Sequence, residues 1–569
     1  MSAIPRTRDD GRAGGVALVA LTAVGQAVAA GGAAFAMRDV FAALHEPGRT
    51  APFASLLILL LAAVAVAGFR VAGRSVAERV GQGYVIALRH VLFSHLTRMP
   101  AGAVAGRRNG ALAIRFVGDL AAARNWVGLG LARIVAAAIV VPGSIVALVL
   151  LDARLAAAAA IPLLLGVAVM IAVGAGMGSV HGRLRSKRAN LAIAVMERAP
   201  SAPELRLLGR DAAELKALRE GGAAVRRAAV SRVLRIEVLR RLPDVAAAAS
   251  AVAVLWLALS GHLPAAEAAG ALAVLAILVQ PLRDLASVWD YRCAWVIARD
   301  KLGKLLASPT LDAPTLDAPT LDAPGARPAG RRPRTPAYLE FMDVRCGPLR
   351  DFDAVAEPGT KIAVIGPNGA GKSLCLALAA GLEATEDGRV ELDGRDLAGV
   401  STRERQRSIV FVGPRSPVLQ GSLRRALTLG VKPRPDDGDI ERAAHAYGLG
   451  PVLERLGGLD GRVAEGGRNL SSGEATRLHL VRAVLAKPRL LILDEPDHAL
   501  DLDGVTALRR LLEETRATTL FAPRDASLAR KADVLWYIDG GQVQVAGPPG
   551  ELIEHDADVA SWFRPRHAA

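Results

Sequence analysis

Six long apolar runs in the first half of the chain constrain its fold more than any other feature. A helix needs roughly 20 apolar residues to cross the ~30 Å hydrocarbon core of a bilayer. Six nearly uncharged runs of that length are not typical of the buried helices of a soluble protein. We therefore predict an all-α, six-helix transmembrane domain over residues 1–307. The predicted spans are 15–37, 53–73, 129–151, 154–178, 243–262 and 264–282.

The distribution of charge supports a membrane protein and predicts its orientation. The formal net charge is +15, and arginines crowd segments 70–124 and 179–241, between the apolar runs. Cytoplasmic loops of membrane proteins are enriched in Lys and Arg. We therefore expect both long gaps and both termini to be cytoplasmic, and the short joints between spans to be external. The lipid bilayer accounts for the basic charge, so we expect no nucleic-acid partner.

A repeat separates the two halves of the chain. Residues 310–324 read TLDAP three times, and a Pro- and Arg-rich stretch, 325–336, follows. Proline disfavours both helix interiors and sheet ladders. We therefore predict a Pro-rich repeat linker over 308–336, and a second domain over 337–569.

A glycine-rich segment at the start of the second domain matches the P-loop pattern G-x-x-x-x-G-K-[ST]. It follows the apolar run 362–365 and precedes a helical run, 374–382. In that context, backbone N–H groups converge on phosphate at a helix N-terminus. We expect Lys372 to reach the β- and γ-phosphates of ATP, and Ser373 to ligate Mg²⁺. The predicted nucleotide-binding residues are Gly366, Pro367, Asn368, Gly369, Ala370, Gly371, Lys372 and Ser373.

Two carboxylates follow a run of four apolar residues, in the sequence LLILDE at 490–495. Such a run is typical of a buried parallel strand. Asp494 at its end is placed to hold Mg²⁺ through water. Glu495 is placed to orient and deprotonate the attacking water, and is the predicted catalytic residue.

The P-loop, the segment LSSGE at 470–474 and the run LLILDEP occur in an order and spacing that resemble those of ABC transporters. Asp501, in ALD, resembles the D-loop of that family. The resemblance implies an α/β P-loop NTPase domain of ABC type with a helical subdomain. Six spans followed by one ATPase domain resemble the layout of an exporter-type half-transporter.

The resemblance also implies a dimer. In this family two ATPase domains enclose two nucleotides, and each site pairs the P-loop of one chain with the signature of the other. Ser471, Ser472 and Gly473 would therefore contact the γ-phosphate held by a second half-transporter.

The chain departs from the family pattern at two positions. Pro414 falls where the family has a Gln that touches Mg²⁺ and water, and Pro523 falls where it has a His that bonds the γ-phosphate. Proline offers neither a side-chain donor nor a backbone N–H. We therefore expect this chain's own site to bind MgATP but to hydrolyse it slowly, which favours a heterodimer over a homodimer.

These observations predict a subunit of an ATP-driven exporter. The spans are poor in polar and aromatic residues, which favours a small or amphipathic cargo, although a peptide or a lipid stays open. A composition rich in Ala and Arg suggests a bacterial inner membrane. Two alternatives stay open, namely a homodimeric exporter and a nucleotide-gated regulatory membrane protein with little turnover.

Overall fold

The computed structural model describes residues 4–6, 9, 11–45, 52–107, 112, 115–262, 264–311 and 335–564. Most of the predicted linker, including the greater part of the TLDAP repeat, lies outside these ranges. The chain divides into two compact units. Unit 1 comprises Met1–Thr97 and Ala105–Ser308, and unit 2 comprises Arg98–Val104 and Pro309–Ala569.

Six helical segments in the described part of unit 1 are long and apolar enough to cross a membrane. Each overlaps one of the predicted spans, so the prediction of a six-helix membrane domain is confirmed. The segments are Arg12–Leu44, Phe53–Leu96, Arg115–Leu151, Ala153–Arg198, Asp211–Ser260 and Ala265–Leu306.

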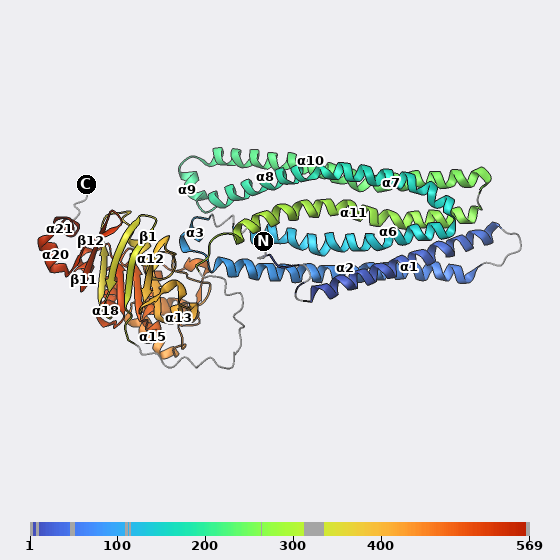
Figure 1. The fold of residues 1–569 in the computed structure, drawn as a ribbon. Coiled ribbons are helices and arrows are strands. Elements are labelled where there is room, and N and C mark those ends of the chain that lie inside the picture. The colour runs from blue at the N-terminus through green and yellow to red at the C-terminus, as the bar shows by residue number, and fades with distance from the viewer. Residues whose placement is uncertain are drawn as a thin grey trace. The chain divides into compact units, whose positions relative to one another are not determined.

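Several of these segments are divided into consecutive helical elements. The elements of unit 1 are α1 (Arg12–His45), α2 (Phe53–Leu96), η1 (Arg115–Asp119), α5 (Leu120–Arg124), η2 (Asn125–Leu131), α6 (Ala132–Leu151), α7 (Ala153–Ala175), α8 (Met177–Arg198), α9 (Ala202–Leu207), α10 (Asp211–Leu257), η3 (Ala258–His262) and α11 (Ala265–Leu306). The short helix α3 (Ala101–Ala105) falls almost wholly within the segment assigned to unit 2. Figure 1 shows the α6–α7 and α10–α11 joints at one end of the bundle and α9 at the other.

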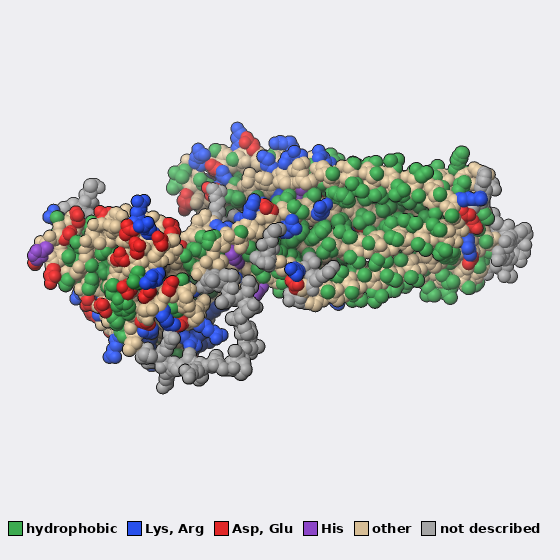
Figure 2. Space-filling model, viewed as in Figure 1, with side chains coloured by type: hydrophobic (Ala, Val, Ile, Leu, Met, Phe, Trp, Pro, Cys, Tyr) green, Lys and Arg blue, Asp and Glu red, His purple; other side chains and the backbone are tan. Residues whose placement is uncertain are grey.

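The helices are longer than a bilayer is thick. α2 has 44 residues and α10 has 47, which at 1.5 Å per residue correspond to about 66 and 70 Å. A hydrocarbon core of ~30 Å covers less than half of that length. Figure 2 shows hydrophobic side chains over much of the visible face of the bundle, and Lys and Arg gathered toward the end that carries α8 and α9. The helices therefore extend beyond the membrane at their basic end.

Small residues let the helices of unit 1 approach closely. A Cβ added to Gly166 on α7 would lie 2.5 Å from the Cβ of Ala246 on α10. In lipid, where apolar side chains gain nothing by leaving the solvent, such tight packing is a main source of helix association. Outside the apolar region, polar contacts join the helices instead: Asp290 on α11 forms an ion pair with Arg232 on α10, with a shortest N–O distance of 2.5 Å, and lies 3.0 Å from His181 Nδ1 on α8.

Unit 2 is built on a six-stranded sheet with the order β12-β11-β3-β10-β9-β6. All neighbours in it are parallel except β12 and β11. A second, antiparallel sheet has the order β2-β1-β4-β5, and β7 pairs with β8. The strands are β1 (Leu339–Cys346), β2 (Leu349–Ala356), β3 (Lys361–Ile365), β4 (Asp387–Leu392), β5 (Arg395–Asp396), β6 (Ile409–Val412), β7 (Gly421–Ser422), β8 (Arg462–Val463), β9 (Leu490–Asp494), β10 (Thr518–Ala522), β11 (Val534–Asp539) and β12 (Gln542–Gly547).

Helices surround these sheets. They are α12 (Lys372–Ala379), η4 (Leu397–Gly399), α13 (Thr402–Ser408), α14 (Leu423–Leu427), α15 (Asp437–Ala446), α16 (Gly450–Leu456), η5 (Glu465–Gly467), α17 (Ser472–Ala486), α18 (Leu502–Glu514), α19 (Ala526–Ala529), α20 (Pro549–His555) and α21 (Ala557–Phe563). The helices α14 to α17, with η5 among them, lie between β6 and β9 in the chain and form the helical part of the unit. The predicted α/β fold with a helical subdomain is confirmed.

The central strands are buried on both faces, as a covered parallel sheet requires. All five residues of β9 and of β10 are buried. Alternate residues of β3 belong to different cores: Ile362 and Val364 pack with the antiparallel sheet, and Ala363 and Ile365 pack with α17 and α18. This double burial holds the ends of the strands rigidly, and the candidate site lies at those ends.

Candidate functional site

The P-loop, the Asp494–Glu495 pair and the two prolines lie at or after the carboxyl ends of four neighbouring parallel strands. The register pairs Ala522 of β10 with Asp494 of β9, and Val412 of β6 with Leu493. On the other side of β10, Phe521 pairs with Ala363 of β3. The loops that leave β3, β10, β9 and β6 therefore meet at one edge of the sheet, where doubly wound folds bind their ligands.

The P-loop connects β3 to α12 through a backbone that a side chain would block. Gly366 has φ 141°, and a Cβ there would lie 2.0 Å from the carbonyl oxygen of Ile538 on β11. Only glycine fits this close approach. The loop delivers Lys372 and Ser373 to the first turn of α12, and the N–H groups at a helix N-terminus attract anions.

The ammonium group of Lys372 folds back over the loop. Its Nζ donates hydrogen bonds to the carbonyl oxygens of Gly366, at 2.9 Å, and of Pro367, at 2.7 Å. The positive charge is thereby held above the N–H groups of the loop. A phosphate bound in the loop would lie within reach of it.

The two predicted Mg²⁺ ligands lie together. Ser373 Oγ donates a hydrogen bond of 2.9 Å to Asp494 Oδ1. Asp494 is 9% exposed, and burial is the main cause that raises the pKa of its carboxyl group, against the hydrogen bond from Ser373 and the charges of Arg415 and Lys372. A hydroxyl and a buried carboxylate are the hard oxygen ligands that Mg²⁺ prefers. The pair therefore fits the predicted ion.

Glu495, the predicted catalytic residue, is held by the loop after β10. Its backbone has φ 47°, and its N–H donates to the carbonyl oxygen of Ala522 at 3.0 Å. Its Oε2 forms an ion pair with Arg524 Nη2 at 2.8 Å. The carboxylate that would accept a proton from water is therefore engaged with a guanidinium group. The sequence placed Arg524 next to Pro523, but nothing in it indicated this partner.

Asp497 fastens the same loop from the other side. Its carboxylate accepts hydrogen bonds from the backbone N–H of Arg524, at 2.9 Å, and of Asp525, at 2.7 Å. Pro523, between Ala522 and Arg524, is buried. The loop with Pro523, where the family has a histidine, is thus held against the segment after β9 through Asp497. Pro523 itself provides no side-chain hydrogen-bond donor.

Pro414 lies at the tip of a tight turn that follows β6. The N–H of Gly413 donates to Ser416 Oγ, and the N–H of Ser416 donates to the oxygen of Gly413, both at 2.9 Å. Pro414 and Arg415 are exposed on this turn. Burial raises the pKa of the Asp494 carboxyl group, and the positive charge of Arg415 opposes that rise in part. Sequence reasoning missed Arg415, which brings a second guanidinium group to the edge of the site.

The helix that begins with the signature residues packs against the segment that carries Asp501. Ser471 caps α17: its Oγ accepts a hydrogen bond from the N–H of Glu474, and the Glu474 carboxylate accepts one from the N–H of Ser471. A Cβ on Gly473 would lie 2.8 Å from the oxygen of Ala499. Asp501 forms an ion pair with Arg477 on α17. A hydrogen bond from the N–H of Gly504, together with Arg477, holds the pKa of the Asp501 carboxyl group below its usual value.

These features define a membrane protein with a P-loop ATPase domain in the same chain. Comparison with known families identifies it further. Residues 16–282 match the ABC transporter transmembrane region, and residues 349–498 match the ABC transporter ATPase model. The chain belongs to the ABC transporter family, with the exporter-type half-transporter organisation in which both parts are fused. It is a multi-pass membrane protein.

Curated relatives share parts of the chain. The mycobactin import ATP-binding/permease protein IrtB of Mycolicibacterium thermoresistibile is 31% identical over 332 residues, which cover 55% of this chain and 53% of that protein. The β-(1→2)glucan export ATP-binding/permease protein NdvA of Bradyrhizobium diazoefficiens is 32% identical over 219 residues, 38% of this chain and 36% of that one. The alignments thus span about half or less of these relatives. One is named for import and the other for export.

A solved structure shares the fold over nearly the whole length. The structure of a bacterial Atm1-family ABC exporter with ATP bound has a TM-score of 0.82, and the match covers 98% of each chain at 20% sequence identity.

Proposed function

We propose that the chain binds MgATP and couples it to the export of an amphipathic molecule across a bacterial inner membrane, as one half of a dimer. The observation that carries this proposal is the assembly of Lys372, Ser373, Asp494 and Glu495 at one edge of a sheet, in a chain with six membrane helices. The basic helix ends support a cytoplasmic position for the ATPase domain and both termini.

Each of these residues has a distinct task in the proposed reaction. The P-loop N–H groups and Lys372 hold and orient the β- and γ-phosphates. Ser373 and Asp494 hold Mg²⁺, which supplies charge neutralisation on the phosphate oxygens. Glu495 accepts a proton from the attacking water after its carboxylate leaves Arg524. Ser471, Ser472, Gly473 and Asp501 complete the site of a partner chain.

We further propose that the chain's own site turns over slowly and that its partner is a different half-transporter. Pro414 and Pro523 cannot supply the two side-chain contacts of the family pattern, and Arg524 neutralises Glu495. Loss of one contact made mainly in the transition state costs on the order of 10²–10³ in rate. A partner with complete loops would use the signature of this chain to form a competent site.

ATP hydrolysis by the purified chain tests the slow site. We expect ATP binding with turnover close to that of the Glu495→Gln variant. Brisk hydrolysis that Glu495→Gln abolishes would contradict the slow site and favour a homodimer. Purification from native membranes should then show whether a second half-transporter accompanies the chain.

A nucleotide-gated regulatory protein is the second candidate, favoured by the Arg524–Glu495 ion pair. Inside-out vesicles that contain the chain and its co-purified partner separate the two. ATP-dependent uptake supports export if vanadate abolishes it. It also supports export if uptake is lost when the partner's glutamate equivalent to Glu495 is replaced by Gln. Responses to a non-hydrolysable ATP analogue without net uptake support regulation.

A further inference from the structure

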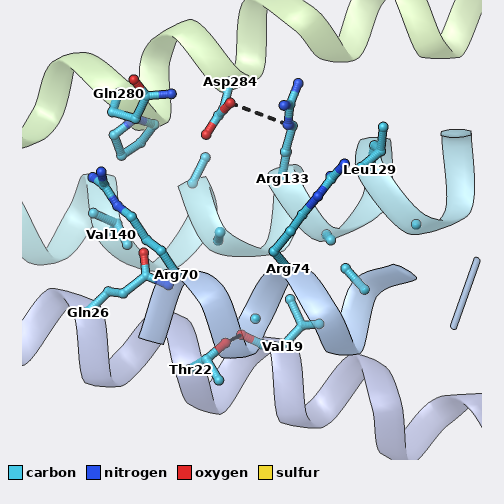
Figure 3. Close-up of a pocket in the computed structure, with 17 residues that line it drawn as sticks. Val19, Thr22, Gln26, Arg70, Arg74, Leu129, Arg133, Val140, Gln280 and Asp284 are labelled. Atoms are coloured by element: carbon cyan, nitrogen blue, oxygen red, sulfur yellow. Dashed lines mark hydrogen bonds and ion pairs between the residues drawn. The ribbon is translucent and has the colours of Figure 1, made fainter. Parts of the chain in front are cut away.

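A polar pocket lies within the membrane helices of unit 1. Its volume is about 310 Å³, and α1, α2, η2, α6 and α11 line it. Four charged side chains reach it: Arg70 and Arg74 from α2, Arg133 from α6, and Asp284 from α11 (Figure 3). Such residues are rare in membrane helices and are costly there without a partner. Their convergence from three helices requires an explanation.

Only one of the three arginines has its charge balanced. Arg133 Nε lies 3.3 Å from Asp284 Oδ1, the pair marked by the dashed line in Figure 3. Arg133 also contacts Tyr291, with Nη1 3.4 Å from the hydroxyl oxygen and the guanidinium carbon 5.4 Å from the ring centre. Over the described ranges of the chain, no hydrogen bond or ion pair engages Arg70 or Arg74. The pocket therefore carries an excess of two positive charges.

The charged groups share one depth in the bundle. Arg70 lies 17 residues from the start of α2, Arg133 lies 18 residues from the end of α6, and Asp284 lies 19 residues from the start of α11. These helix ends are on the predicted external side. At 1.5 Å per residue these three groups are about 25 to 29 Å from it, and Arg74, one turn beyond Arg70, is about 32 Å from it. The charged groups thus lie near the cytoplasmic boundary of a ~30 Å core.

The rest of the lining is apolar or neutral. Val19, Leu129 and Val140 lie beside the charges, and Gln26 and Gln280 add neutral hydrogen-bonding groups. A ligand that satisfies both parts carries a negative head and an apolar body. An uncharged cargo would leave two guanidinium groups without a counter-charge, and a small inorganic anion would leave the apolar wall unused.

We propose that this pocket binds the anionic head group, a carboxylate or a phosphate, of an amphipathic cargo. Arg70 and Arg74 bind the head group, and the apolar lining holds the body. Arg133, already paired with Asp284, shapes the pocket and adds to its positive electrostatic potential. The inference rests on the proposed function in naming the ligand as cargo, but the binding itself does not depend on ATP.

Binding by the full-length chain in phosphatidylcholine nanodiscs, without nucleotide, tests the pocket. The probe is a fluorescent sixteen-carbon carboxylic acid, and its methyl ester is the neutral control. We expect the acid to bind about tenfold or more tightly than the ester, because bonds to charged groups are worth more than neutral ones. The Arg70→Gln/Arg74→Gln double variant should abolish that preference.

Two further variants sharpen the test. Arg79 lies on the same helix, α2, but outside the pocket lining. The Arg79→Gln variant should keep the preference for the acid over the ester. Asp284→Asn removes the one negative charge of the pocket and should tighten binding of the acid several-fold. Equal binding of acid and ester by the natural chain, or an unchanged preference in a double variant that melts like the natural chain, would overturn the proposal.

The source of the head group is decided by competition. Displacement of the acid in nanodiscs that contain phosphatidylglycerol supports the pocket and indicates a lipid ligand. Undiminished binding there supports it and indicates a cytosolic amphiphile. Acid binding without ATP-driven uptake would refute the proposed export and leave the pocket standing. ATP-driven uptake without a preference for the acid would refute the pocket and leave the proposed export standing.

Discussion

At the scale of single residues, the candidate site combines the predicted phosphate-binding loop with surroundings that depart from the family pattern. Lys372 donates to the carbonyl oxygens of Gly366 and Pro367 in the loop, and Ser373 donates to Asp494. Glu495 is held by Arg524, and Arg415 adds its charge near Asp494. The binding part and the hydrolytic part of the site can therefore be tested separately.

Replacing Lys372 with Ala should weaken ATP binding. Its ammonium group lies over the loop, and loss of a charge-assisted contact to phosphate costs about 1.5–3 kcal/mol, or roughly 10- to 100-fold in Kd. Fluorescence titration with a labelled ATP measures this. Lys531→Ala, which removes an exposed lysine that pairs with Glu513, is the control and should bind as the natural chain does.

Replacing Arg524 with Gln should raise the slow hydrolysis by the chain's own site several-fold. The change frees the Glu495 carboxylate from the 2.8 Å ion pair, while both groups stay partly exposed and the fold loses about 1 kcal/mol or less. Phosphate release at saturating ATP is the measurement, with Arg516→Gln as a matched surface control. A lower rate in Arg524→Gln would mean that Arg524 contacts the phosphate instead.

At the scale of elements, α17 links the signature to the turn that carries Pro414. Its N-terminus is capped by Ser471, and further along it His479 is buried. Arg482 on the same helix donates to the carbonyl oxygens of Pro417 and Ala426. Burial, and then the charge of Arg482, lowers the pKa of His479 to about 4. The helix is therefore fitted around a neutral imidazole.

The stability of the chain should depend on pH through His479. The folded form binds a proton only near pH 4, whereas the unfolded form binds one near 6.5. The contribution of neutral His479 to the free energy of unfolding is therefore fully present above pH 6.5 and is lost as the pH falls toward 4. At pH 5 the loss is about 2 kcal/mol. Thermal unfolding of unit 2 at pH 8 and pH 5 should show a smaller difference in His479→Gln. The exposed His555→Gln should behave like the natural chain.

At the scale of the whole molecule, the membrane helices and the ATPase fold have different determinants. The spans follow the thickness of the bilayer, and the helices then continue as basic extensions about as long again. In unit 2, the double burial of β9 and β10 brings the loops after the strands to one edge. The orientation of the helices in the membrane decides on which side the ATPase domain lies, and it can be measured directly.

Cysteine labelling in intact bacteria and in inverted vesicles should establish that orientation. With Cys293, Cys346 and Cys375 replaced by Ala, a cysteine at Leu208, exposed beside α9, should react only from the cytoplasmic side. A cysteine at Ala265, at the start of α11, should react only from the external side. Labelling of both positions from one side would contradict the predicted topology.

Much of the fold could be predicted because its signals are local. A span is recognised from roughly 20 consecutive apolar residues, since every backbone polar group in lipid must be satisfied within its helix. The P-loop is recognised from eight residues because its glycines, lysine and helix start act together. The same holds for LLILDE and for Ser471, whose cap uses a residue three positions away. The site residues stay predictions, although the structure brings Ser373 and Asp494 together.

Contacts between distant segments were decided by the tertiary structure alone. Glu495 meets Arg524 because β9 and β10 run side by side and end at the same level. Arg70, Arg74, Arg133 and Asp284 face one pocket because the helices that carry them pack together at one depth. The sequence by itself determined which segments are long and apolar enough to cross the membrane and predicts which loop binds phosphate, since neighbouring residues set both. Which charges lie opposite one another depends on packing, and no local pattern encodes it.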